Sequence, residues 1–473
     1  MSLFNQQIKL PALCSHLHLI GIGGTGLSNI AYYLSSQGYK ISGSEIQHNQ
    51  ATDWLKKNGI KVFYGHQRSN ISKDIKLVIK SAAVKDNNPE IIEANQKHIP
   101  IIKYAQALGI LMSDKIGIAI SGTHGKTTTT SLISYLLTKA KLNPSFMVGG
   151  VLRDFNTGSI FGKGDHFVAE ACEYDRSFHH LPARIKIVTN IEADHMDYYK
   201  TFDNLLESFR QFIATTPSDG FVIANIENPG VQKCLKKKIT ASLITFASKS
   251  FRQCQWYPQN IRVIKDKWYF EAWKNGRKYG DFVNAIPGEH NILNALSAII
   301  VADIIKIDKN VVRKALADFR GIHRRFEIID LVKERIIIDD YGHHPTEIKS
   351  VLNTARKVFP DRRLWFVFQP HLYSRTKLFL KEFAQVLSLA DIVLIPPIYA
   401  ARDIKASHQI ISSEDLVAKI NEYGGHAKYL PDFTSAVKYL LENTVPKDVV
   451  VTIGAGDVWQ IGREFTKQLK NYT

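Results

Sequence analysis

Residues 117–130 read GIAISGTHGKTTTT, in which an apolar run ends in a glycine-rich loop, a lysine and four threonines. This order is typical of a phosphate-binding loop, because glycines leave backbone N–H groups free to face phosphate oxygens and the lysine reaches the terminal phosphate. The loop is shorter than usual, since the first glycine would normally fall at Ile120 and stands at Gly122. Lys126 is therefore predicted to bind the terminal phosphate of a nucleoside triphosphate, and Thr127 is placed to bind magnesium.

A plain loop with a surface lysine is the alternative interpretation of this segment. The surroundings favour the phosphate loop, because an apolar strand-like run precedes it and a helical pattern follows it. The apolar residues that would share one side of that helix are Leu132, Ile133, Leu136 and Leu137.

Carboxylates and a histidine follow two later strand-like runs. HFVAEACEYDRSF places Glu170, Glu173 and Asp175 past one run, and IVTNIEADHMDYY places Asp194, His195 and Asp197 past another. A parallel sheet brings such strand ends together beside the phosphate loop. Carboxylates suit magnesium, and an imidazole adds a ligand or a hydrogen bond. Each residue alone is more often a helix cap or a surface group, but their joint placement predicts a magnesium site.

The segment GIGGTGLSNIA holds a second glycine pattern, G-x-G-x-x-G at Gly21, Gly23 and Gly26. It follows a strand-like run and precedes a helical one, so its backbone N–H groups and the helix N-terminus can bind a diphosphate. Glu45 ends the next strand, where a dinucleotide enzyme places the acid that binds a ribose hydroxyl. Alone this favours a nicotinamide dehydrogenase, and a tight helix–strand turn is the structural alternative. In context we favour a nucleotide diphosphate.

Strand-like and helical runs alternate along the whole chain, which predicts parallel sheets covered by helices. HLHLI at 16–20 and YKISGSE at 39–45 are predicted strands of a first α/β unit, with a helix that stops at Gly38 between them. The unit continues through LVIKSAAV at 77–84 and IPIIKYA at 99–105. IGIAISG begins a second unit, and a third begins after GIHRRFE at 321–327 with the strand RIIIDD.

Length and composition set limits on these units. The chain of 473 residues predicts two to four domains, with two or three favoured, and its 45% hydrophobic and 22% charged residues are ordinary for a globular protein. No segment reaches the ~18 uninterrupted apolar residues of a membrane span, and no secretory signal is evident, so we expect a cytoplasmic protein. The four cysteines form no CxxC pair, which argues against both a disulfide framework and a zinc site.

The net charge is +17, from 61 Lys and Arg against 44 Asp and Glu. Such an excess can mark a nucleic-acid-binding protein, whose basic side chains displace counterions from phosphates. Here the basic clusters at 56–61 and 236–238 are diluted by acids elsewhere, and no basic stretch alternates with aromatic residues. We therefore expect no nucleic acid partner, and the excess would instead attract small anionic substrates.

The motifs belong to a longer ordered set. The chain contains, in this order, GTHGKTTTT, E-x-x-E at 170–173, TNIEADHMDYY, GEHNILNALSAI, GIHRRFEI, DDYGHHPTEI and FQPHLYSRT. From GIGGTG to GAGD at 454–457 they resemble the Mur ligases of peptidoglycan synthesis. The resemblance implies three α/β domains: a Rossmann-like UDP-sugar domain (1–113), a central P-loop ATPase domain (114–323) and a C-terminal Rossmann-like domain that brings the amino acid (324–473). The loop at 21–26 would then bind UDP rather than NAD.

The resemblance also implies an ATP site with ATP and Mg²⁺ as cofactors. Lys126 would bind the γ-phosphate, and Thr127, Glu173 and His195 would hold the metal. His290, Asn291 and Asn294 in GEHNILNA resemble the motif at the adenine end of ATP. The alternative interpretation of these residues is a polar helix start, and Asn294 is also consistent with a structural role. The residues predicted to bind ATP are Gly122, Thr123, His124, Gly125, Lys126, Thr127, Thr128, His290, Asn291, Asn294, Arg325 and Asp340, the last two as residues that complete the site when the domains close.

Two further groups of residues follow from the same resemblance. Those implied for the UDP-sugar are Gly21, Gly23, Gly24, Thr25, Gly26, Ser44, His66 and Ser81. Those implied for the amino acid and the sugar carboxylate are Tyr341, His343, His344, His371 and Arg375, and an arginine suits this task because its fork matches a carboxylate. The implied catalytic residues are Lys126, Glu173, His195, His343 and Arg375.

Within the family, the motifs are most similar to those of members that join L-alanine to the carboxylate of UDP-N-acetylmuramate. In that reaction ATP converts the carboxylate to an acyl phosphate, which the amine attacks through a tetrahedral intermediate. The expected partners are therefore these two small molecules, with no nucleic acid and no membrane. The chain is expected to act as a monomer or a weak homodimer.

Three other functions remain open on the sequence. A murein-tripeptide ligase would recycle a peptide onto the same UDP-sugar, but examples of it tend to have alanine where this chain has Glu347. An NAD-dependent oxidoreductase would explain GIGGTG and Glu45 but leaves the second phosphate loop unexplained. A non-catalytic nucleotide-binding module would release no phosphate with any substrate.

The chain departs from the family pattern near both substrate pockets. Where many relatives read QPHRYSRT, Leu372 replaces an arginine and leaves Arg375 with more of the anion binding. In KYAQAL, Tyr104 stands where an arginine is often found. Ligases that add later residues often carry a modified lysine beyond the DHMD segment, and SFRQF at 208–212 shows no counterpart.

Overall fold

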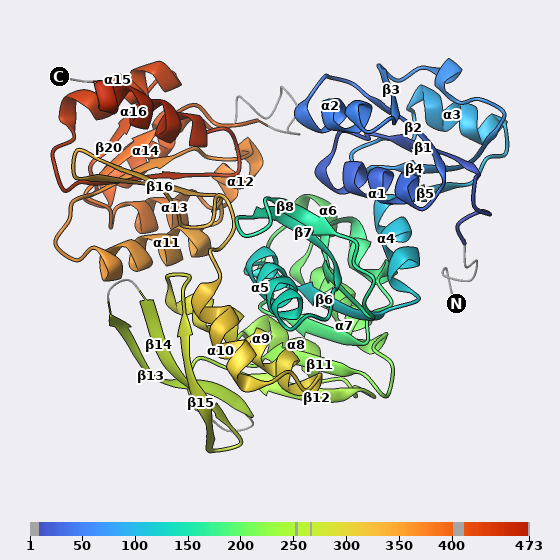
Figure 1. Ribbon diagram of the computed structural model, residues 1–473. Coiled ribbons are helices and arrows are strands. Elements are labelled where there is room, and N and C mark those ends of the chain that lie inside the picture. Colours follow the sequence, from blue (N-terminus) through green and yellow to red (C-terminus); the bar gives the residue numbers. More distant parts are fainter. Residues whose placement is uncertain (1–8, 251–253, 265–266, 401–410, 472–473) are drawn as a thin grey trace.

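The computed structural model describes residues 9–250, 254–264, 267–400 and 411–471. It contains three sheets that follow one another along the chain, each accompanied by helices (Figure 1). In this view the first sheet lies at the upper right in blue, the second in the centre and below, and the third at the upper left in orange and red. The predicted α/β fold with three domains is confirmed, whereas the boundaries at 113/114 and 323/324 stay predictions.

The first sheet has the order β3-β2-β1-β4-β5, and its strands are all parallel. HLHLI forms β1, because Leu17, Leu19 and Ile20 are fully buried in a strand at the centre of the sheet. The strands are β1 (His16–Ile20), β2 (Lys40–Glu45), β3 (Lys61–Tyr64), β4 (Ile75–Lys80) and β5 (Ile101–Lys103). The helices are α1 (Thr25–Ser36), α2 (Gln50–Lys57), η1 (Arg68–Asn70), α3 (Pro89–Gln96) and α4 (Tyr104–Met112).

The second sheet has the order β15-β14-β13-β12-β11-β10-β6-β9-β7-β8. Neighbouring strands from β13 to β7 are parallel, and antiparallel strands extend the sheet at both ends. Its strands are β6 (Ile116–Ser121), β7 (Ser145–Leu152), β8 (Thr157–Ile160), β9 (His166–Glu170), β10 (Ile185–Val188), β11 (Phe221–Asn225), β12 (Ser242–Phe246), β13 (Trp256–Ile264), β14 (Lys267–Lys274) and β15 (Arg277–Asn284).

Helix α5 begins directly after the phosphate loop and packs against α9. The four apolar residues predicted to share one side of α5 are all buried, at 0–1% exposure, but every residue from Thr127 to Leu137 is buried, so α5 is covered on all sides and is not amphipathic. The helices of this part of the chain are α5 (Lys126–Lys139), η2 (Tyr174–His180), α6 (Met196–Tyr199), α7 (Phe202–Ala214), α8 (Pro229–Leu235), α9 (Glu289–Ile304) and α10 (Lys309–Asp318).

The third sheet has the order β16-β17-β21-β18-β19-β20, in which β16 is antiparallel to β17 and the other neighbours are parallel. Its strands are β16 (Glu327–Val332), β17 (Arg335–Asp340), β18 (Leu364–Phe368), β19 (Ile392–Ile395), β20 (Ala427–Tyr429) and β21 (Val449–Ile453). Its helices are α11 (Pro345–Val358), α12 (Tyr373–Leu378), α13 (Leu380–Leu387), α14 (Ser413–Glu422), α15 (Phe433–Asn443) and α16 (Trp459–Asn471).

Besides the antiparallel pair β7 and β8, two parts of the fold differ from the predicted run of alternating strands and helices. The third unit begins with β16, one strand before the predicted RIIIDD, and a two-residue turn at Lys333 and Glu334 joins them with φ angles of +45° and +63°. Strands β13 to β15 form an antiparallel extension with a turn at Asn275 and Gly276. Both are hairpins at a sheet edge, where burial on one face suffices to hold a strand.

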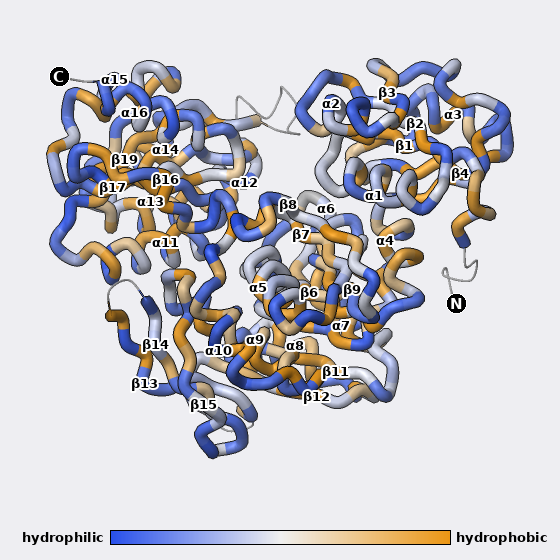
Figure 2. Tube along the Cα trace, in the orientation of Figure 1, coloured by the Kyte–Doolittle hydropathy of each residue, from blue (hydrophilic) through white to orange (hydrophobic). Residues whose placement is uncertain are grey.

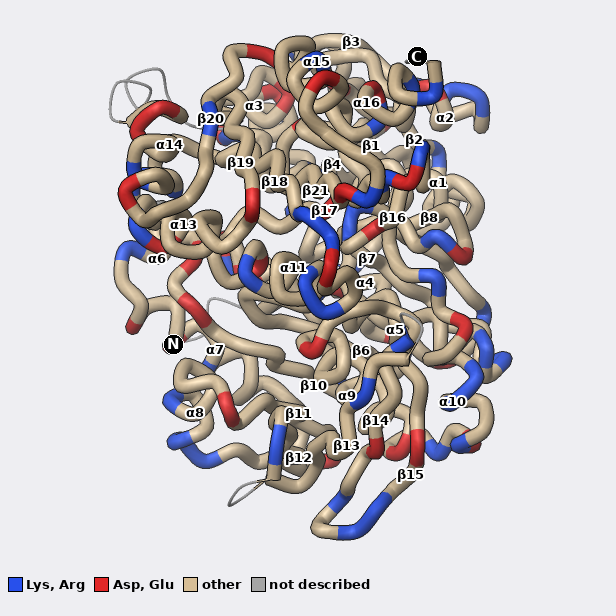
Figure 3. Tube along the Cα trace, turned by 90° about the vertical axis from the view of Figure 1, so that its left-hand side faces the viewer, with Lys and Arg blue, Asp and Glu red and all other residues tan. Residues whose placement is uncertain are grey.

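Hydrophobic segments concentrate inside each of the three parts, and hydrophilic segments follow the outer loops (Figure 2). The largest fully buried side chains include Trp256 and Trp268 in the second part and Trp365 in the third. Among the helices of the described ranges, none is both long and apolar enough to cross a lipid bilayer. In the face shown in Figure 3, basic segments are interspersed with acidic ones.

Contacts join the central part of the chain to both neighbours. Lys103 Nζ, from the first part, lies 2.6 Å from Asp175 Oδ2, and Lys357 of α11 pairs with Glu289 of α9. The central sheet is therefore flanked on two sides, and side chains of the third part can reach the carboxyl ends of its strands.

Lys186 on β10 is a buried cation within this central sheet, at 1% exposure. Its Nζ donates to Phe212 O at 2.6 Å and to Thr215 Oγ1 at 2.7 Å, at the end of α7. Burial lowers the pKa of this ammonium group from its ordinary 10.5 to about 7. Between these two values the unfolded chain binds the proton and the folded chain does not, so the free energy of unfolding should rise with pH across this window.

We expect Lys186→Met to remove this rise. Relative to the variant, the wild-type chain should gain up to a few kcal/mol in the free energy of unfolding between about pH 7 and pH 10, because one pKa unit corresponds to about 1.36 kcal/mol. Thermal unfolding of both proteins over this range measures the difference. Parallel stability curves would show that Lys186 keeps its ordinary pKa.

Candidate active site

The phosphate loop connects the end of β6 to Lys126, the first residue of α5. Gly122 and Gly125 have φ angles of +137° and +82°, in the region that favours glycine. A β-carbon on Gly122 would overlap Thr189 Oγ1, and one on Gly125 would lie 2.8 Å from Asn294 Oδ1. Only glycine fits both positions, so the loop runs in close contact with β10 and α9.

Two residues that follow β10 hold the loop in place. Asn190 Oδ1 accepts a hydrogen bond from His124 N at 2.8 Å, and Thr189 Oγ1 donates to His124 O at 2.6 Å. Thr123 N donates to Asn190 O at 2.9 Å. Thr189 and Asn190 were missed in the sequence, although their position at the carboxyl end of a parallel strand, shortly before His195, was an available signal.

Lys126 Nζ is held by the loop and by one acid. It donates to Gly122 O, to Thr123 O at 3.1 Å and to Glu173 Oε1 at 3.0 Å. Burial disfavours its charge, but the carboxylates of Glu173 and Glu170 outweigh burial and raise the pKa of Lys126. Lys126 is thus a fixed positive charge at the N-terminus of α5, where the helix dipole also favours an anion.

The predicted magnesium ligands lie together beside Lys126. Thr127 Oγ1 donates to Glu170 Oε2 at 2.9 Å, and Glu173 Oε2 is buried without a hydrogen-bond partner among the described residues. His195 Nε2 lies 3.7 Å from Glu173 Oε1, and burial lowers the pKa of this imidazole and keeps it neutral. A hydroxyl and an unpartnered carboxylate oxygen are ligands that Mg²⁺ prefers. Thr127, Glu173 and His195 therefore fit the metal, although its binding stays a prediction.

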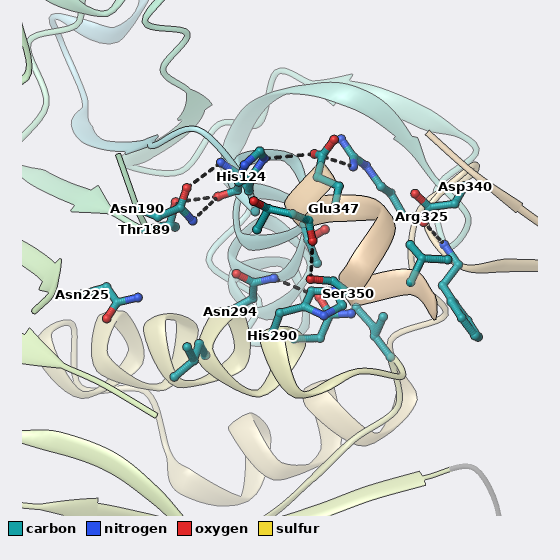
Figure 4. A pocket seen from close by; sticks show the side chains of 18 of the residues that line it. His124, Thr189, Asn190, Asn225, His290, Asn294, Arg325, Asp340, Glu347 and Ser350 are labelled. Atoms are coloured by element: carbon teal, nitrogen blue, oxygen red, sulfur yellow. Dashed lines mark hydrogen bonds and ion pairs between the residues drawn. The ribbon is translucent and has the colours of Figure 1, made fainter. Parts of the chain in front are cut away.

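A cavity of about 160 Å³ adjoins the loop on the side of α9 (Figure 4). His290 is part of its wall and is an exposed residue. Apolar walls with a few polar groups at the edge are typical of a site for a nucleoside. Of the residues predicted for ATP, the lining includes His124, Gly125, Thr128, His290, Asn291, Asn294, Arg325 and Asp340.

Two of the asparagines that line this cavity, Asn291 and Asn294, make hydrogen bonds inside the protein. Asn294 Nδ2 donates to Asn291 Oδ1 at 2.9 Å, and Thr129 Oγ1 donates to Asn294 Oδ1 at 3.0 Å. Asn291 Nδ2 donates to Pro287 O at 2.6 Å. These bonds join α5 to α9 and shape the wall of the cavity, which agrees with the structural alternative for Asn294.

Asp340 also bonds within the protein. Its two oxygens accept from Phe326 N at 2.7 Å and from Gly342 N at 2.6 Å, and burial raises its pKa to about 6. Asp340 thus fastens the end of β17 to the segment before β16. Arg325 points into the cavity, where its Nη1 lies 3.5 Å from Glu347 Oε1.

His124 connects the phosphate loop to the third part of the chain (Figure 4). Its Nε2 lies 3.4 Å from Glu192 Oε2, and its Nδ1 lies 3.3 Å from Glu347 Oε1 on α11. Burial favours the neutral imidazole, but the two carboxylates outweigh burial and raise the pKa of His124 to about 9. A protonated His124 therefore bridges two domains at neutral pH.

A larger cavity of about 500 Å³ lies on the other side of the loop. It joins Lys126, Thr127 and His195 of the central part to residues of the third part. Of the residues predicted to handle the amino acid, the lining includes Tyr341, His343, His371 and Arg375. The phosphate loop thus faces the predicted amino-acid residues across one continuous space.

His344, which is also predicted for the amino acid, lies apart from these residues, and its role stays a prediction. It is 5% exposed and does not line the larger cavity. Its Nδ1 accepts from Thr346 N at 3.3 Å as the cap of α11, and its ring packs on Phe379. His344 therefore begins a helix and fills the interface, while its neighbour His343 faces the cavity.

Arg375 is 8% exposed and lies at the border of the central and third parts. Its Nη2 donates to Asp194 Oδ1 at 2.9 Å, and its Nη1 lies 3.2 Å from His371 Nδ1. Leu372, the departure from the family pattern, is 4% exposed at a φ of +69° and lines a small pocket with Met196. Position 372 therefore supplies an apolar wall, and Arg375 is left as the arginine of α12 that reaches the larger cavity.

Three family models match the chain in order. They are the Mur ligase family catalytic domain at residues 16–116, the Mur ligase middle domain at 120–302 and the Mur ligase glutamate ligase domain at 324–456. The chain belongs to the Mur ligase family. The predicted resemblance is confirmed, and the chain is an ATP-dependent, amide-forming ligase of three domains.

Named relatives match nearly the whole of this Mur ligase. The UDP-N-acetylmuramate–L-alanine ligase of Caldanaerobacter subterraneus subsp. tengcongensis is 39% identical over 456 residues, which cover 96% of this chain and 98% of the relative. The UDP-N-acetylmuramate–L-alanine ligase of Acetivibrio thermocellus is 40% identical over 460 residues, 97% of each chain.

Solved structures show the same similarity. A UDP-N-acetylmuramate–alanine ligase from Thermotoga maritima superposes with a TM-score of 0.81 at 28% identity and covers 97% of this chain and 100% of its own. A murein peptide ligase from Psychrobacter arcticus gives a TM-score of 0.69 at 25% identity, with 97% and 99% covered. Of these two structures, the alanine ligase is thus more similar to this Mur ligase.

The glycine loop of this Mur ligase lies at the carboxyl end of β1, and neither cavity described above includes it. Gly23 N donates to Glu45 Oε2 at 2.9 Å, and Gly24 is the N-cap of α1, which begins at Thr25. A β-carbon on Gly26 would lie 2.7 Å from the ring of Tyr104, the second departure from the family pattern. Tyr104 therefore supports the loop by packing.

Ser44, Ser81 and His66 lie near this loop in different environments. Ser81 N donates to Ile20 O at the end of β1. Ser44 is 0% exposed, and its Oγ donates to Glu90 Oε2 at 2.6 Å and lies 3.0 Å from His66 Nδ1. Ser44 thus supports the partly exposed His66, and binding of the UDP-sugar by Ser44, His66 and Ser81 stays a prediction.

We expect Glu347→Gln to lower the pKa of His124 from about 9, because one of the two carboxylates that favour its protonated ring is removed. The bridge it forms is complete below the ordinary pKa of 6.5 and is lost as the pH rises through about 9. An NMR titration of the histidine rings, assigned with His124→Gln, measures this. Glu289→Gln, which removes another carboxylate between the same domains, should leave the curve unchanged; equal curves for Glu347→Gln and wild type would contradict the assignment.

Proposed function

We propose that this Mur ligase joins L-alanine to the carboxylate of UDP-N-acetylmuramate with ATP, giving UDP-N-acetylmuramoyl-L-alanine, ADP and phosphate for peptidoglycan synthesis. The observation that carries the proposal is the larger cavity, in which the phosphate-binding Lys126 faces the carboxylate-binding Arg375. The relatives named above, which carry this activity in their names, support the same choice of substrates.

The chemistry proceeds in two steps. An oxygen of the sugar carboxylate bonds to the γ-phosphorus of ATP as ADP leaves, which gives an acyl phosphate. The amine nitrogen then bonds to the acyl carbon, and phosphate leaves when the tetrahedral intermediate collapses. Lys126 and the N–H groups at the start of α5 bind the phosphoryl oxygens as their charge changes. When bound to Thr127, Glu173 and His195, Mg²⁺ neutralises part of the same negative charge.

The domains divide this work in the proposal. Residues 1–113 bind the UDP-sugar at the loop 21–26, residues 114–323 bind ATP, and residues 324–473 bring the amino acid. The +17 net charge attracts both anionic substrates. The reaction belongs in the cytoplasm, where ATP is available, and the chain acts as a monomer or a weak homodimer.

The alternatives explain less. A tripeptide ligase would tend to have alanine at position 347. In this chain Glu347 contacts both His124 and Arg325 at the nucleotide site, and alanine would remove the carboxylate from both cations. An NAD-dependent oxidoreductase would not explain why Lys126, Glu173 and His195 lie together beside a phosphate loop. A non-catalytic module would not need metal ligands beside a phosphate loop.

The proposal is tested by phosphate release with ATP, Mg²⁺ and UDP-N-acetylmuramate in the presence of L-alanine, glycine, L-serine or the murein tripeptide. We expect the highest kcat/KM with L-alanine. A preference for the tripeptide would favour the recycling ligase. Absence of phosphate release, with a change in nicotinamide absorbance instead, would favour the oxidoreductase.

We expect Lys126→Ala to reduce turnover by roughly a thousandfold, because it removes a preorganised positive charge from the transferred phosphoryl group. The variant should still fold but melt at a lower temperature than wild type, because Glu173, at 2% exposure, loses its cation, so turnover is compared at a temperature where both proteins are folded. Lys139→Ala, at the exposed end of the same helix, is the matched control and should retain full turnover. Wild-type turnover in Lys126→Ala would remove this lysine from the mechanism.

A further inference from the structure

We propose that Asp194 and Arg375 together form the receptor for the zwitterionic head group of the incoming amino acid, with Arg375 binding its carboxylate and Asp194 its ammonium group. The inference rests on the proposed function and adds to it a substrate-binding role for Asp194. Of these two residues, the family resemblance implied a substrate-binding role only for Arg375.

The two residues form a nearly buried ion pair that joins two domains. Arg375 Nη2 lies 2.9 Å from Asp194 Oδ1, and the side chains are 8% and 12% exposed. Both line the larger cavity, which also contains Lys126 and His195. Burying such a pair costs desolvation energy that its own attraction only partly offsets, so a pair kept at the wall of a cavity is well suited to a ligand that carries both charges.

Both partners keep capacity for a ligand. Asp194 Oδ1 accepts from Arg375 and from His195 N at 2.7 Å, but Oδ2 makes no hydrogen bond among the described residues, and its distance to His195 Nε2 is 3.8 Å. A guanidinium has five N–H donors, and the contacts to Asp194 and His371 use two of them. A zwitterion can therefore bind with its ammonium group on Asp194 and its carboxylate on Arg375. Each charge of the ligand then lies beside an opposite charge of the protein, and the ligand adds no net charge to the site.

The pair also has the right direction for the reaction. From the phosphate loop, Lys126 contacts Glu173 at 3.0 Å, Glu173 lies 3.7 Å from His195, and His195 lies 3.8 Å from Asp194. Arg375 is one step further away, on α12 of the third domain. An amino acid bound in this way presents its nitrogen toward the phosphoryl group and its carboxylate away from it, and once the ammonium group has released a proton to solvent the free amine can attack the acyl carbon.

Asp194→Asn tests the inference because it keeps the size of the side chain and removes its charge. We expect the KM for L-alanine to rise roughly tenfold to a hundredfold, as for the loss of one charge-assisted hydrogen bond, while the KM values for ATP and UDP-N-acetylmuramate stay within about twofold. Glu289→Gln, which breaks the exposed pair with Lys357 between the same two domains, is the matched control and should leave all three KM values unchanged.

A second measurement separates binding of the amino acid from a merely structural role. Hydroxylamine is a small nucleophile without a carboxylate that traps acyl phosphates, so hydroxamate formation from ATP and UDP-N-acetylmuramate should be nearly equal in wild type and Asp194→Asn. An unchanged KM for L-alanine, or equal losses in both assays, would overturn the inference. If the wild-type enzyme forms hydroxamate but no product with L-alanine, the proposed amino acid substrate is wrong instead. Failure of the proposed function is thereby distinguished from failure of the inference about Asp194.

Discussion

The close contact between the phosphate loop and the end of β10 is the constraint on which the rest of the site depends. Gly122 lies against Thr189 and has no room for a side chain, and Asn190 bonds the backbone of His124. These contacts fix the start of α5, and with it the direction of Lys126. Once that amine is fixed, Glu173 becomes its partner, and His195, which is also predicted to hold the metal, lies beside Glu173. If the loop were held less tightly, the charge of Lys126 would have no fixed position relative to Glu173.

The second level of organisation is electrostatic, and it places the third domain. His124 holds Glu347 of α11, and Asp194 holds Arg375 of α12, so two charged pairs cross the same border on either side of the phosphate loop. Neither pair is strongly solvated, which makes each contact more sensitive to the loss of one charge than a surface ion pair is. The third domain is therefore held by charged groups of the kind proposed to bind the substrates, and binding and domain contact are expected to be linked.

Much of the fold could be predicted because its central elements are locally consistent. The strand at 16–20 and the helix after the phosphate loop carry apolar patterns of the correct period, and both are found with those residues buried. The edge hairpins were missed for different reasons. The turn between β14 and β15 contains Asn275-Gly276, a recognised hairpin signal that was not weighed. The turn between β16 and β17 uses Lys333 and Glu334 at positive φ, and such residues rarely adopt this conformation, so local propensity gave no signal there.

The site shows where sequence reasoning stops. Lys126, Thr127 and Glu173 could be grouped in advance because strand order in a parallel sheet brings the ends of neighbouring strands together. The partner of Arg375 could not, since Asp194 lies 181 positions earlier in the chain and only the docking of two domains decides which of many acids it meets. Likewise Asn294 reads as a nucleotide ligand in a motif, and the structure shows that bonds to Asn291 and Thr129 already use one of its two N–H donors and one of its two acceptor sites. Spacing thus identifies which groups can do chemistry, and three-dimensional hydrogen bonding decides which of them remain available for it.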